Sequence, residues 1–354
     1  MKALLAALAL LGSGAAQALH LPDMPLHDPF ILADAEAKTY YLYTSNVPAL
    51  TGVCAVGTMV YESHDLKDWT APKVVFTLPK DIWANGGGWA PEVHLWKGRY
   101  YLFTTVHNEQ TPIPGEARPN RHPYRRGTVL AEASTPEGPF TLVNGGEPVA
   151  GASRMTLDGT LYVDPRGKPW EVYAHEWLQQ TDGTMEAVPL DGDLKAVGDP
   201  VVLFKSSDAP WVKGSLKGPN DTVYVTDGPE LYRTKDGHLL MLWSSYDQHG
   251  YVESEARSDS GEIGGPWTQL EPLVRQDSGH GMLFHGFDGK LMLVLHRPFK
   301  NARGKLYEVA DAGDHLEIVR ERTDLDFDGT PSAPIARATC KAGGEVLRAL
   351  RRGA

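Results

Sequence analysis

The chain of 354 residues has only two cysteines, Cys54 and Cys340. Two cysteines are too few for a disulfide-stapled scaffold or for a zinc site built from cysteines. They can pair with each other in an oxidising compartment, and the alternative is two separate buried thiols. The sequence therefore excludes a small disulfide-rich module and leaves the pairing open.

Basic residues are also in deficit. Lys and Arg number 34 against 45 Asp and Glu, which gives a formal net charge of -11 and a pI of about 5.6. Nucleic acids and anionic membrane surfaces bind through clustered positive charge. We therefore expect no nucleic-acid and no membrane partner, whereas a neutral or cationic ligand is compatible with this balance.

Long apolar runs are absent beyond the N-terminus. Residues 1–18 read MKALLAALALLGSGAAQA, with Lys2 ahead of an apolar stretch and a small-x-small cleavage site at residues 16–18. This pattern is typical of a secretory signal peptide, and its apolar stretch is too short to span a membrane. We predict a secreted or periplasmic protein whose mature chain starts near Leu19.

Helix-type periodicity is scarce as well. Between residues 19 and 335, turns rich in Gly, Pro and Asp separate short strand-like runs, which predicts an all-β domain. Only the segment 336–354 contains a helical pattern, and we interpret this short basic stretch as a solvated C-terminal tail. The expected regions are a signal peptide (1–18), a β domain (19–335) and the tail (336–354).

Five strand runs share a lead-in of turn residues followed by an apolar strand. They are DAEAKTYYLYTS (34–45), LWKGRYYLFTT (95–105), VDPRGKPWEVYAHEW (163–177), RTKDGHLLMLWSS (233–245) and GFDGKLMLVLHRP (286–298). Each run predicts a β-hairpin, and their recurrence every roughly 50–70 residues predicts a five-bladed β-propeller. Polar segments at 62–72, 134–143 and 260–270 fit the outer strand of a blade. A pair of β-sandwiches is the alternative, but it would not repeat one hairpin in this way.

An ionisable residue stands upstream of each hairpin at a similar offset. These residues are Asp28, Glu92, Asp158, Asp227 and His280. The first strand of each propeller blade lines the central channel, so we expect the five side chains to converge at one end of it. Any single Asp-Gly or Asp-Pro pair is most simply a turn, but five ionisable residues at one register predict a shared polar pocket.

Tryptophans accompany the acidic positions, at Trp83, Trp89, Trp177 and Trp211. Aromatic faces stack on the apolar faces of sugar rings, while carboxylates and amides bind the hydroxyl groups. Core packing is the alternative for each tryptophan. The combination favours a carbohydrate ligand, an oligosaccharide or a polysaccharide.

Glycoside hydrolysis needs one protonated carboxyl group and one ionised carboxylate. A third carboxylate can raise the pKa of the acid by like-charge repulsion. Asp28, Asp158 and Asp227 supply such a trio from three different blades. They are the candidate catalytic residues.

The motifs resemble those of glycoside hydrolase family 43 and of the related families 62 and 117. The matching segments are HDPFI (27–31), GWAPEV (88–93), LDGTLYVDPRGKPWEVY (157–173), TDGPELY (226–232) and GHGMLF (279–284). The resemblance covers nearly the whole chain after residue 18. It implies a propeller that hydrolyses α-L-arabinofuranosides or β-D-xylosides with inversion, with Asp28 as general base and Asp158 tuning and orienting the acid.

The general acid is the position at which the sequence departs from the family. Where the family has Glu-Gly-Pro, this chain has Asp227-Gly228-Pro229, and aspartate is shorter by one methylene. Because a general acid has to reach the leaving oxygen, Glu176 and Glu230 are alternatives to Asp227. Strand alternation would place residues 227 and 230 on opposite faces, unless a turn at Gly228 and Pro229 changes the parity.

A histidine serves as the acid in family 117, so His175 and His249 are further alternatives. The resemblance also implies a set of substrate-binding residues: His27, Trp89, Glu92, His175, Trp177, His280 and Arg297. For Arg297 the alternative is a surface ion pair.

No cofactor is required by the expected reaction. In the family the histidine matched by His280 often faces a calcium or sodium ion in the channel, which makes His280 a candidate metal neighbour. Calcium prefers oxygen ligands, so the alternative for His280 is a hydrogen bond to substrate or to a carboxylate. Competing functions are a non-catalytic sugar-binding propeller and an anhydro-galactosidase.

Overall fold

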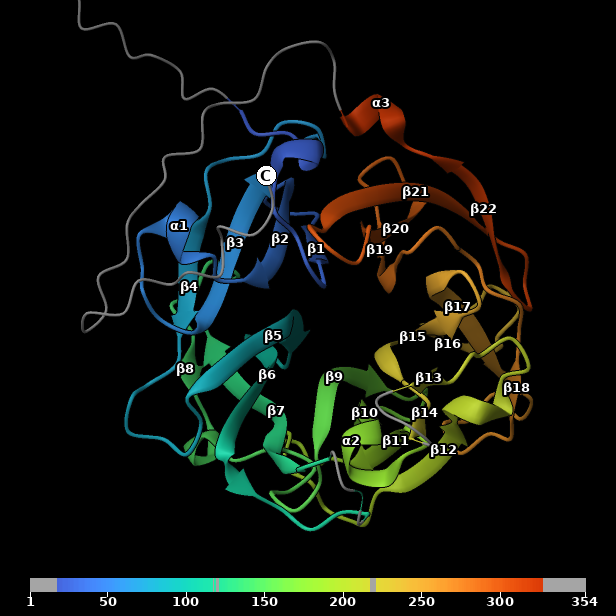
Figure 1. The fold of residues 1–354 in the computed structure, drawn as a ribbon. Helices are drawn as coiled ribbons and strands as arrows, with labels where there is room; N and C mark the ends of the chain where they lie inside the picture. Colours follow the sequence, from blue (N-terminus) through green and yellow to red (C-terminus); the bar gives the residue numbers. More distant parts are fainter. Residues whose placement is uncertain (1–17, 117, 119–120, 217–220, 327–354) are drawn as a thin grey trace, which may run out of the picture.

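The computed structural model describes residues 18–116, 118, 121–216 and 221–326, and within them the chain forms five four-stranded antiparallel sheets around a central axis (Figure 1). This confirms the five-bladed β-propeller and excludes the pair of β-sandwiches. The predicted signal peptide up to residue 17 and the tail from residue 336 lie outside the described residues, so their boundaries stay predictions.

Each blade uses its strands in chain order, from the axis outward. Blade one contains β1 (Phe30–Asp34), β2 (Thr39–Ser45), β3 (Gly57–Ser63) and β4 (Lys73–Thr77). Blade two contains β5 (Gly86–Trp96), β6 (Arg99–Pro112), β7 (Tyr124–Ala133) and β8 (Thr141–Leu142). Blade three contains β9 (Thr156–Val163), β10 (Pro169–His175), β11 (Thr184–Pro189) and β12 (Val201–Lys205). Blade four contains β15 (Asp227–Arg233), β16 (Leu239–Asp247), β17 (Gly250–Ser258) and β18 (Trp267–Gln269), and blade five contains β19 (Gly279–His285), β20 (Leu291–Arg297), β21 (Arg303–Asp311) and β22 (Leu316–Glu321).

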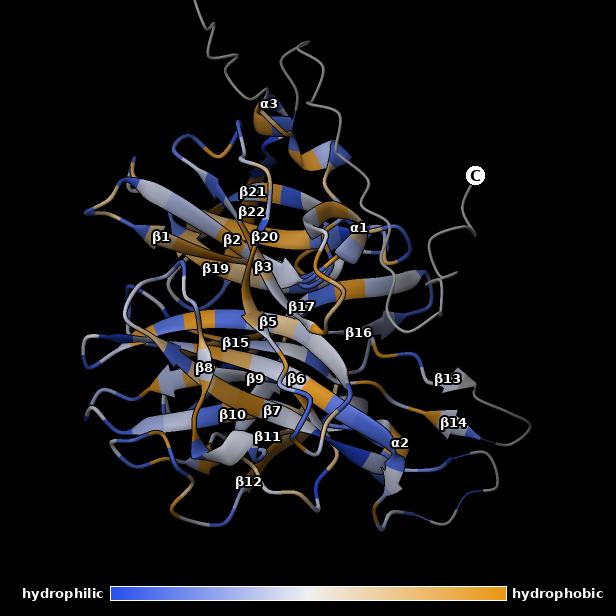
Figure 2. Ribbon diagram, turned by 90° about the vertical axis from the view of Figure 1, so that its left-hand side faces the viewer, coloured by the Kyte–Doolittle hydropathy of each residue, from blue (hydrophilic) through white to orange (hydrophobic). Residues whose placement is uncertain are grey.

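Short elements decorate the connections. They are the helices α1 (Pro48–Thr51), α2 (Trp177–Gln180) and α3 (Thr323–Asp326), the 3-10 turns η1 (Leu21–Asp23), η2 (Asn144–Gly146) and η3 (Ser206–Asp208), and a small hairpin of β13 (Ser215–Leu216) and β14 (Thr222–Val223). In the side view, α2 and the β13–β14 hairpin project from the same face of the propeller (Figure 2). None of the helices in these described ranges combines the length and apolarity needed to cross a membrane.

The five predicted hairpins are the β1–β2, β5–β6, β9–β10, β15–β16 and β19–β20 pairs. The turn between β5 and β6 shows the local cause. Lys97 and Gly98 both have left-handed φ, 48° and 80°, between the paired Trp96 and Arg99, as a two-residue hairpin turn requires. The outer strands β8 and β18 lie within the polar segments 134–143 and 260–270, as expected.

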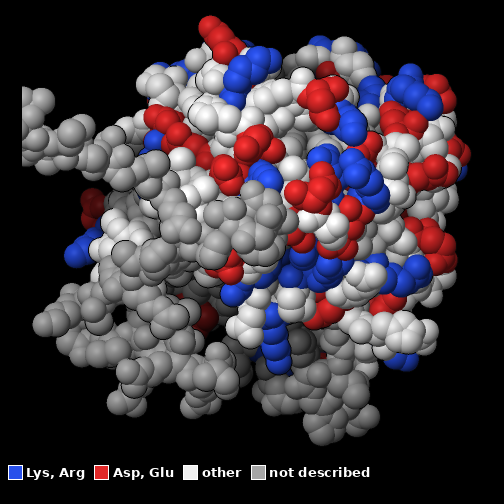
Figure 3. Space-filling model, turned by 90° about the horizontal axis from the view of Figure 1, so that it is seen from above, with Lys and Arg blue, Asp and Glu red and all other residues white. Residues whose placement is uncertain are grey.

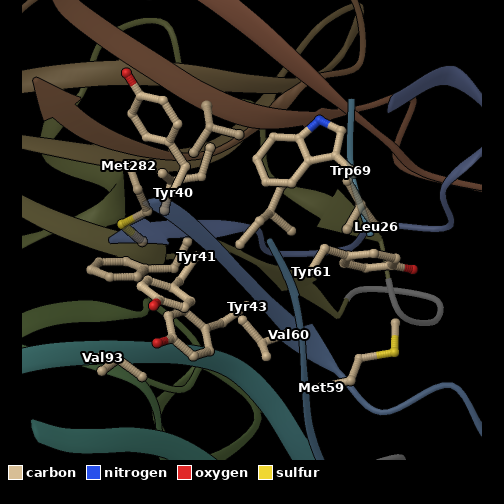
Figure 4. Packing of buried hydrophobic residues seen from close by; sticks show 14 of the residues in the cluster. Leu26, Tyr40, Tyr41, Tyr43, Met59, Val60, Tyr61, Trp69, Val93 and Met282 are labelled. Carbon is tan, nitrogen blue, oxygen red and sulfur yellow. The ribbon is translucent and has the colours of Figure 1, made fainter. Parts of the chain in front are cut away.

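Apolar faces of the inner strands pack between neighbouring blades. In blade one, Tyr41, Tyr43, Tyr61 and Trp69 are buried in one cluster that reaches Val93 of blade two and Met282 of blade five (Figure 4). The Tyr43 hydroxyl donates to the carbonyl of Pro136 at 2.7 Å, which joins blade one to the loop after β7. These blade-to-blade contacts hold the inner strands around the axis.

The N-terminal segment closes the ring. Leu19 pairs with Trp69 in blade one, and Pro25 pairs with Arg303 in blade five. The N–H of Leu26 donates to the carbonyl of Ala302 at 3.1 Å. The segment therefore links the first blade to the last and stabilises the closed ring of blades.

Two expectations from the composition, on the cysteines and on the distribution of charge, can be compared with the structure. Cys54 is disulfide-bonded, so it is not a separate thiol, while Cys340 lies outside the described residues. Basic and acidic side chains are interspersed over the coloured part of the face shown in Figure 3.

Candidate active site

The same backbone feature recurs on the innermost strand of every blade. Residues with left-handed φ of 42–56° stand there at five equivalent places: Asp28, Ala90, Asp158, Gly228 and His280. Around four of these places the pairing register shifts, which marks β-bulges. Four of the five residues are not glycine, and each left-handed non-glycine costs about 1–2 kcal/mol. Strain repeated at one level of the channel indicates a site.

This repeat corrects the predicted register. Asp28, Asp158 and His280 occupy equivalent positions in their blades. In blade four the equivalent residue is Gly228, which Asp227 precedes by one position, and in blade two it is Ala90, which Glu92 follows by two positions. The offsets counted along the sequence from each ionisable residue to its hairpin gave a wrong register, because they include the hairpin turns, whose lengths differ between blades. The expectation of an ionisable residue at one register in all five blades is therefore wrong, although the pocket itself is polar.

Asp28 lies among three imidazoles. Its Oδ1 is 2.8 Å from Nδ1 of His27, 3.3 Å from Nδ1 of His280 and 3.3 Å from Nδ1 of His296. The Asp28 side chain is 17% exposed, whereas His280 and His296 are buried. All three imidazoles thus contact the same carboxylate oxygen, Oδ1.

This surrounding sets the charge of Asp28. Burial alone would raise the pKa of Asp28, but His280 and His27 together hold it well below the usual range. Burial likewise works to lower the pKa of His27, yet the carboxylates of Asp28 and Asp227 raise it to about 9. Asp28 is therefore ionised over the whole neutral range, as a general base has to be.

Asp158 carries the opposite perturbation. It is 4% exposed, and its pKa is raised well above the usual range, first by burial and then by the charge of Asp227, with which it shares a hydrogen bond, and of Asp28. The N–H of Gly228 donates to Asp158 Oδ2 at 3.2 Å and opposes the rise. The raised pKa of Asp158 thus favours its protonated form, beside Asp227 and close to Asp28.

Asp227 and His280 are fixed by blades four and five. Tyr251 of β17 donates its hydroxyl to Asp227 Oδ2 at 2.6 Å. The N–H of His280 donates to Ser244 Oγ at 2.8 Å, and Ser244 donates in turn to Glu253 at 2.9 Å. Both side chains are therefore positioned from outside the innermost strands.

Gly228 gives a test of this packing. A Cβ added there would lie 2.9 Å from Cγ and 3.0 Å from Nδ1 of His280, and its φ is +52°. We expect Gly228→Ala to displace the imidazole from Asp28 and Asp158 and to lower kcat at least tenfold. Gly237 is the matched control, because its φ is +89° but nothing lies within 4 Å of an added Cβ.

Both variants carry the same backbone cost of about 1–2 kcal/mol. Gly237→Ala should therefore lower the melting temperature to a similar extent and keep full activity. Equal activity in the two variants would show that His280 does not depend on the space at Gly228.

Below this level lies a second layer of carboxylates. Glu92 and Glu230 each stand two residues beyond the bulge on their strands, and Glu253 approaches from β17. Burial first, then the charges of Glu92 and Glu253, raise the pKa of Glu230 well above its usual range. The bulge at Gly228 and Pro229 undoes the strand parity, because Asp227 pairs with Ser244 and Glu230 with Leu242. Glu230 therefore belongs to the deeper layer.

Glu176 is engaged with a cation. Its Oε1 lies 2.8 Å from Nη1 of Arg126, and both residues are buried. Burial is the largest influence on the pKa of Glu176 and raises it. The charge of Arg126 lowers this pKa, and the charge of Asp227 raises it further. The Arg126 guanidinium also lies 4.9 Å from the Trp89 ring, whose residue is 37% exposed. Glu176 and Arg126 thus hold Trp89 at the rim of the pocket, which fits the predicted sugar contact.

Other predicted residues lie away from the carboxylate trio. Both ring nitrogens of His175 are bonded, to Glu186 at 2.8 Å and Gln179 at 2.7 Å. His249 stands at the β16–β17 turn beside Gln248. Neither histidine has a position suited to a general acid, so both stay predictions without support from the geometry.

Arg297 and Trp177 complete the predicted set. Arg297 is bonded to Glu321 through both terminal nitrogens, at 3.0 and 2.7 Å, and to Tyr307 at 2.8 Å. Its position fits the ion-pair alternative better than a substrate contact. Trp177 is half-buried at the start of α2, where its carbonyl accepts from Arg121 at 3.0 Å.

Sequence reasoning missed three residues of the site. His296, which lies beside Asp28, precedes Arg297 in the LHRP motif. The sequence prediction at this motif was based on the charge of Arg297 and did not include His296. Tyr251 and Arg126 come from third strands, β17 and β7, which carried no recurring signal. For these two, only the tertiary structure shows the contact: Tyr251 meets Asp227 within blade four, and Arg126 of blade two meets Glu176 after β10 of blade three.

Comparisons with known proteins agree with this geometry. Residues 23–317 match Glycosyl hydrolases family 43. An endo-arabinase from Bacteroides thetaiotaomicron VPI-5482 superimposes with a TM-score of 0.74 and 36% identity, over 84% of this chain and 98% of that one. An endo-1,4-beta-xylanase from the same organism shares the fold, with a TM-score of 0.64, 21% identity and coverage of 86% and 97%.

A curated relative gives a partial match. The extracellular endo-alpha-(1->5)-L-arabinanase 1 of Bacillus subtilis (strain 168) is 29% identical over 206 residues, which are 56% of this chain and 55% of that protein. The alignment thus spans about half the length of that relative. The family match, in contrast, extends over residues 23–317 and includes the strands of the five blades from β1 to β21 and the start of β22. The chain belongs to glycosyl hydrolases family 43.

Proposed function

We propose that this protein is a secreted, endo-acting hydrolase of arabinan that cleaves the chain with inversion. The observation that carries the proposal is the opposed perturbation of two buried carboxyl groups, with the pKa of Asp28 held low and that of Asp158 raised. Groups whose environments push their pKa values apart supply a base and an acid in one pocket. The two relatives named as endo-arabinanases support arabinan as the substrate.

In this proposal Asp28 takes a proton from water. The imidazoles of His27, His280 and His296 surround Oδ1, so Oδ2 accepts the proton as the water oxygen attacks the anomeric carbon. The bond from that carbon to the leaving oxygen breaks on the opposite side. Attack from the far side inverts the configuration.

Asp227 protonates the leaving oxygen. It is less buried than Asp158 and shares a hydrogen bond with it, so the proton that the pair holds is available at the substrate side. Tyr251 donates its hydroxyl to Asp227 and so helps to fix the position of the carboxyl group. Asp158 keeps the proton in the pair and orients Asp227 by accepting from the Gly228 N–H.

A calcium or sodium ion fits the channel, and we propose it as a structural occupant. Two groups of side chains have possible ligand atoms that all lie within 4.8 Å of one another, His27 with Asp28 and His296, and Asp158 with Asp227 and His280, and Nε2 of His280 is buried without a hydrogen-bond partner. Oxygen donors suit a hard cation, and His280 would face it directly or through water. The ion would supply positive charge there, and no step of the reaction depends on it.

Removal of such an ion should lower stability. A ligand that binds only the folded state stabilises it, by about 2.7 kcal/mol at one hundred times its dissociation constant. We expect dialysis against a chelator to lower the melting temperature, and added calcium or sodium to restore it. An unchanged melting temperature with both salts would rule out a bound ion of this kind.

Secretion is supported by two features. The N-terminal sequence is typical of a cleaved signal peptide, and Cys54 is disulfide-bonded, as in oxidising compartments. An enzyme of polymeric arabinan has to meet its substrate outside the cytoplasm. The cell fraction in which the native protein accumulates tests this.

A substrate panel tests the activity. Linear arabinan, aryl α-L-arabinofuranoside, aryl β-D-xyloside and a galactan oligosaccharide should be compared for turnover and product size. We expect arabinan to yield a ladder of oligosaccharides and an inverted anomer by NMR. Release of arabinose alone would indicate an exo-arabinofuranosidase, and binding without turnover would indicate a non-catalytic sugar-binding propeller.

A further inference from the structure

A second cavity opens beside the catalytic trio, on blade four. Its volume is about 640 Å³. The loop after η3, the β16–β17 turn and one residue after β18 line it. The lining residues are Pro210, Trp211, Val212, Lys213, Asp247, Gln248, His249 and Arg275. None of these residues belongs to the catalytic cluster. Trp211 is one of the tryptophans that the sequence singled out and that the active site does not use.

The Trp211 ring is held in a fixed plane. Its indole N–H donates to the carbonyl of Leu270 at 2.9 Å, and its ring centroid lies 5.1 Å from that of the buried Trp243. Trp211 is nevertheless only half-buried, and it lines the cavity. A rigid, partly exposed indole is a platform for the apolar face of a sugar.

The polar groups around this platform are mainly donors. The carboxylate of Asp247 is already used, because it accepts from the N–H groups of His249 and Gly250 at 2.6 and 3.1 Å and from Arg275 Nε at 3.3 Å. Lys213 is exposed and has no ion-pair partner in the part of the chain that the structure describes. The Gln248 amide nitrogen lies 3.0 Å from His249 Nε2, which engages one of its two hydrogens. Lys213 and the second N–H of Gln248 can therefore donate to a ligand rich in oxygen acceptors.

A chain of contacts through Tyr246 joins the cavity to the active site. The N–H of Lys213 donates to the carbonyl of Tyr246 at 2.7 Å. The Tyr246 ring lies 5.1 Å from the Tyr251 ring, and Tyr251 donates to Asp227. Burial first, and then the charge of Asp227, raise the pKa of Tyr246. Tyr246 thus lies between the cavity residue Lys213 and the hydrogen-bonded pair of Tyr251 and Asp227.

We propose that this cavity is a distal sugar-binding site, which holds a unit of the polysaccharide chain remote from the bond that is cleaved. Trp211 stacks on the ring of that unit, and Lys213 and Gln248 donate to its hydroxyl and ring oxygens. This inference rests on the proposed function, because it takes the substrate to be a long chain. It assigns to the site the binding of polymer, and no part in the chemical step.

The double variant Lys213→Ala/Gln248→Ala tests the site. Both side chains are exposed, so the fold should be kept, which Trp211→Ala would not ensure because Trp211 packs on Trp243. We expect KM for linear arabinan to rise about tenfold, the effect of one lost favourable contact of ordinary strength. kcat on arabinan, and both constants on a short aryl arabinobioside, should stay unchanged.

Lys195→Ala is the matched control, since Lys195 is exposed on the turn after β11, at the far end of blade three. An unchanged KM for arabinan in the double variant would overturn the proposal, and so would an equal loss on polymer and arabinobioside. If the wild type cleaves neither substrate, the proposed function fails. Retardation of the protein in gels containing arabinan still decides the site, because the double variant should then migrate faster than the wild type and Lys195→Ala should not.

Discussion

Replacing Asp28 with asparagine should lower kcat on arabinan by about 10³-fold while sugar binding survives. Removal of a positioned general base typically costs about 10²–10⁴-fold. Asparagine keeps the size of the side chain and its contacts with His27 and His280, but it cannot take the proton from water. Initial rates on linear arabinan and calorimetric binding of an arabino-oligosaccharide measure the two effects separately.

Asp34→Asn is the control for this substitution. Asp34 ends β1 in the same blade, and its Oδ1 accepts from the N–H groups of Glu36 and Ala37 at 2.9 Å, a role that asparagine can fill. We expect wild-type activity. Turnover by Asp28→Asn within tenfold of the wild type would mean that the base is another group.

Replacing Asp227 with asparagine should have an effect that depends on the leaving group. On arabinan, whose alkoxide leaves poorly without a proton, kcat should fall about 10³-fold. On a dinitrophenyl arabinobioside, whose phenolate leaves unaided, the loss should stay below about tenfold. The ratio of these two losses identifies the general acid more directly than either one.

The same comparison separates the alternative acids. Glu176→Gln and Glu230→Gln remove the other two candidate carboxyl groups without a large change in shape. If Asp227 is the acid, neither variant should show a loss that depends on the leaving group. Such a loss in Glu176→Gln, together with an unselective loss in Asp227→Asn, would transfer the role to Glu176.

The pH profile follows from the two opposed shifts. Because the pKa of Asp28 is lowered, the ionised base persists below the usual carboxyl range, and the acid limb of kcat/KM should lie there. Because the pKa of Asp158 is raised, the proton held with Asp227 is lost only above that range, and activity should fall as the pH rises through it. In Asp227→Asn, the alkaline limb on the dinitrophenyl substrate should disappear.

The repeat and the blade number were predictable from the sequence, which also supplied the three candidate catalytic carboxylates. Hairpin turns and strand alternation are local, so Lys97-Gly98 and the apolar runs after each turn predicted five inner hairpins without any knowledge of packing. Asp28, Asp158 and Asp227 followed from the motifs upstream of those hairpins. Asp28 and Asp158 do occupy equivalent positions in the channel.

The register and the partners of these residues were decided by the tertiary structure. The bulges at Ala90 and Gly228 moved Glu92 and Glu230 into a deeper layer, because one extra residue in a strand changes which side chains face the channel. His296 and Arg126 act through contacts between blades, and Tyr251 acts across blade four, from β17 to Asp227 of β15. No spacing along the chain encodes these contacts.

The sequence by itself thus determined the fold class and the residue types that can carry the reaction, since both depend on local patterns that repeat. Only the tertiary structure decided which carboxyl group has a lowered pKa and which has a raised one. The pKa of a carboxyl group depends on burial and on charges within a few ångströms, and residues as far apart in the chain as Asp28, Asp158 and His280 acquire those neighbours only when the ring of blades closes.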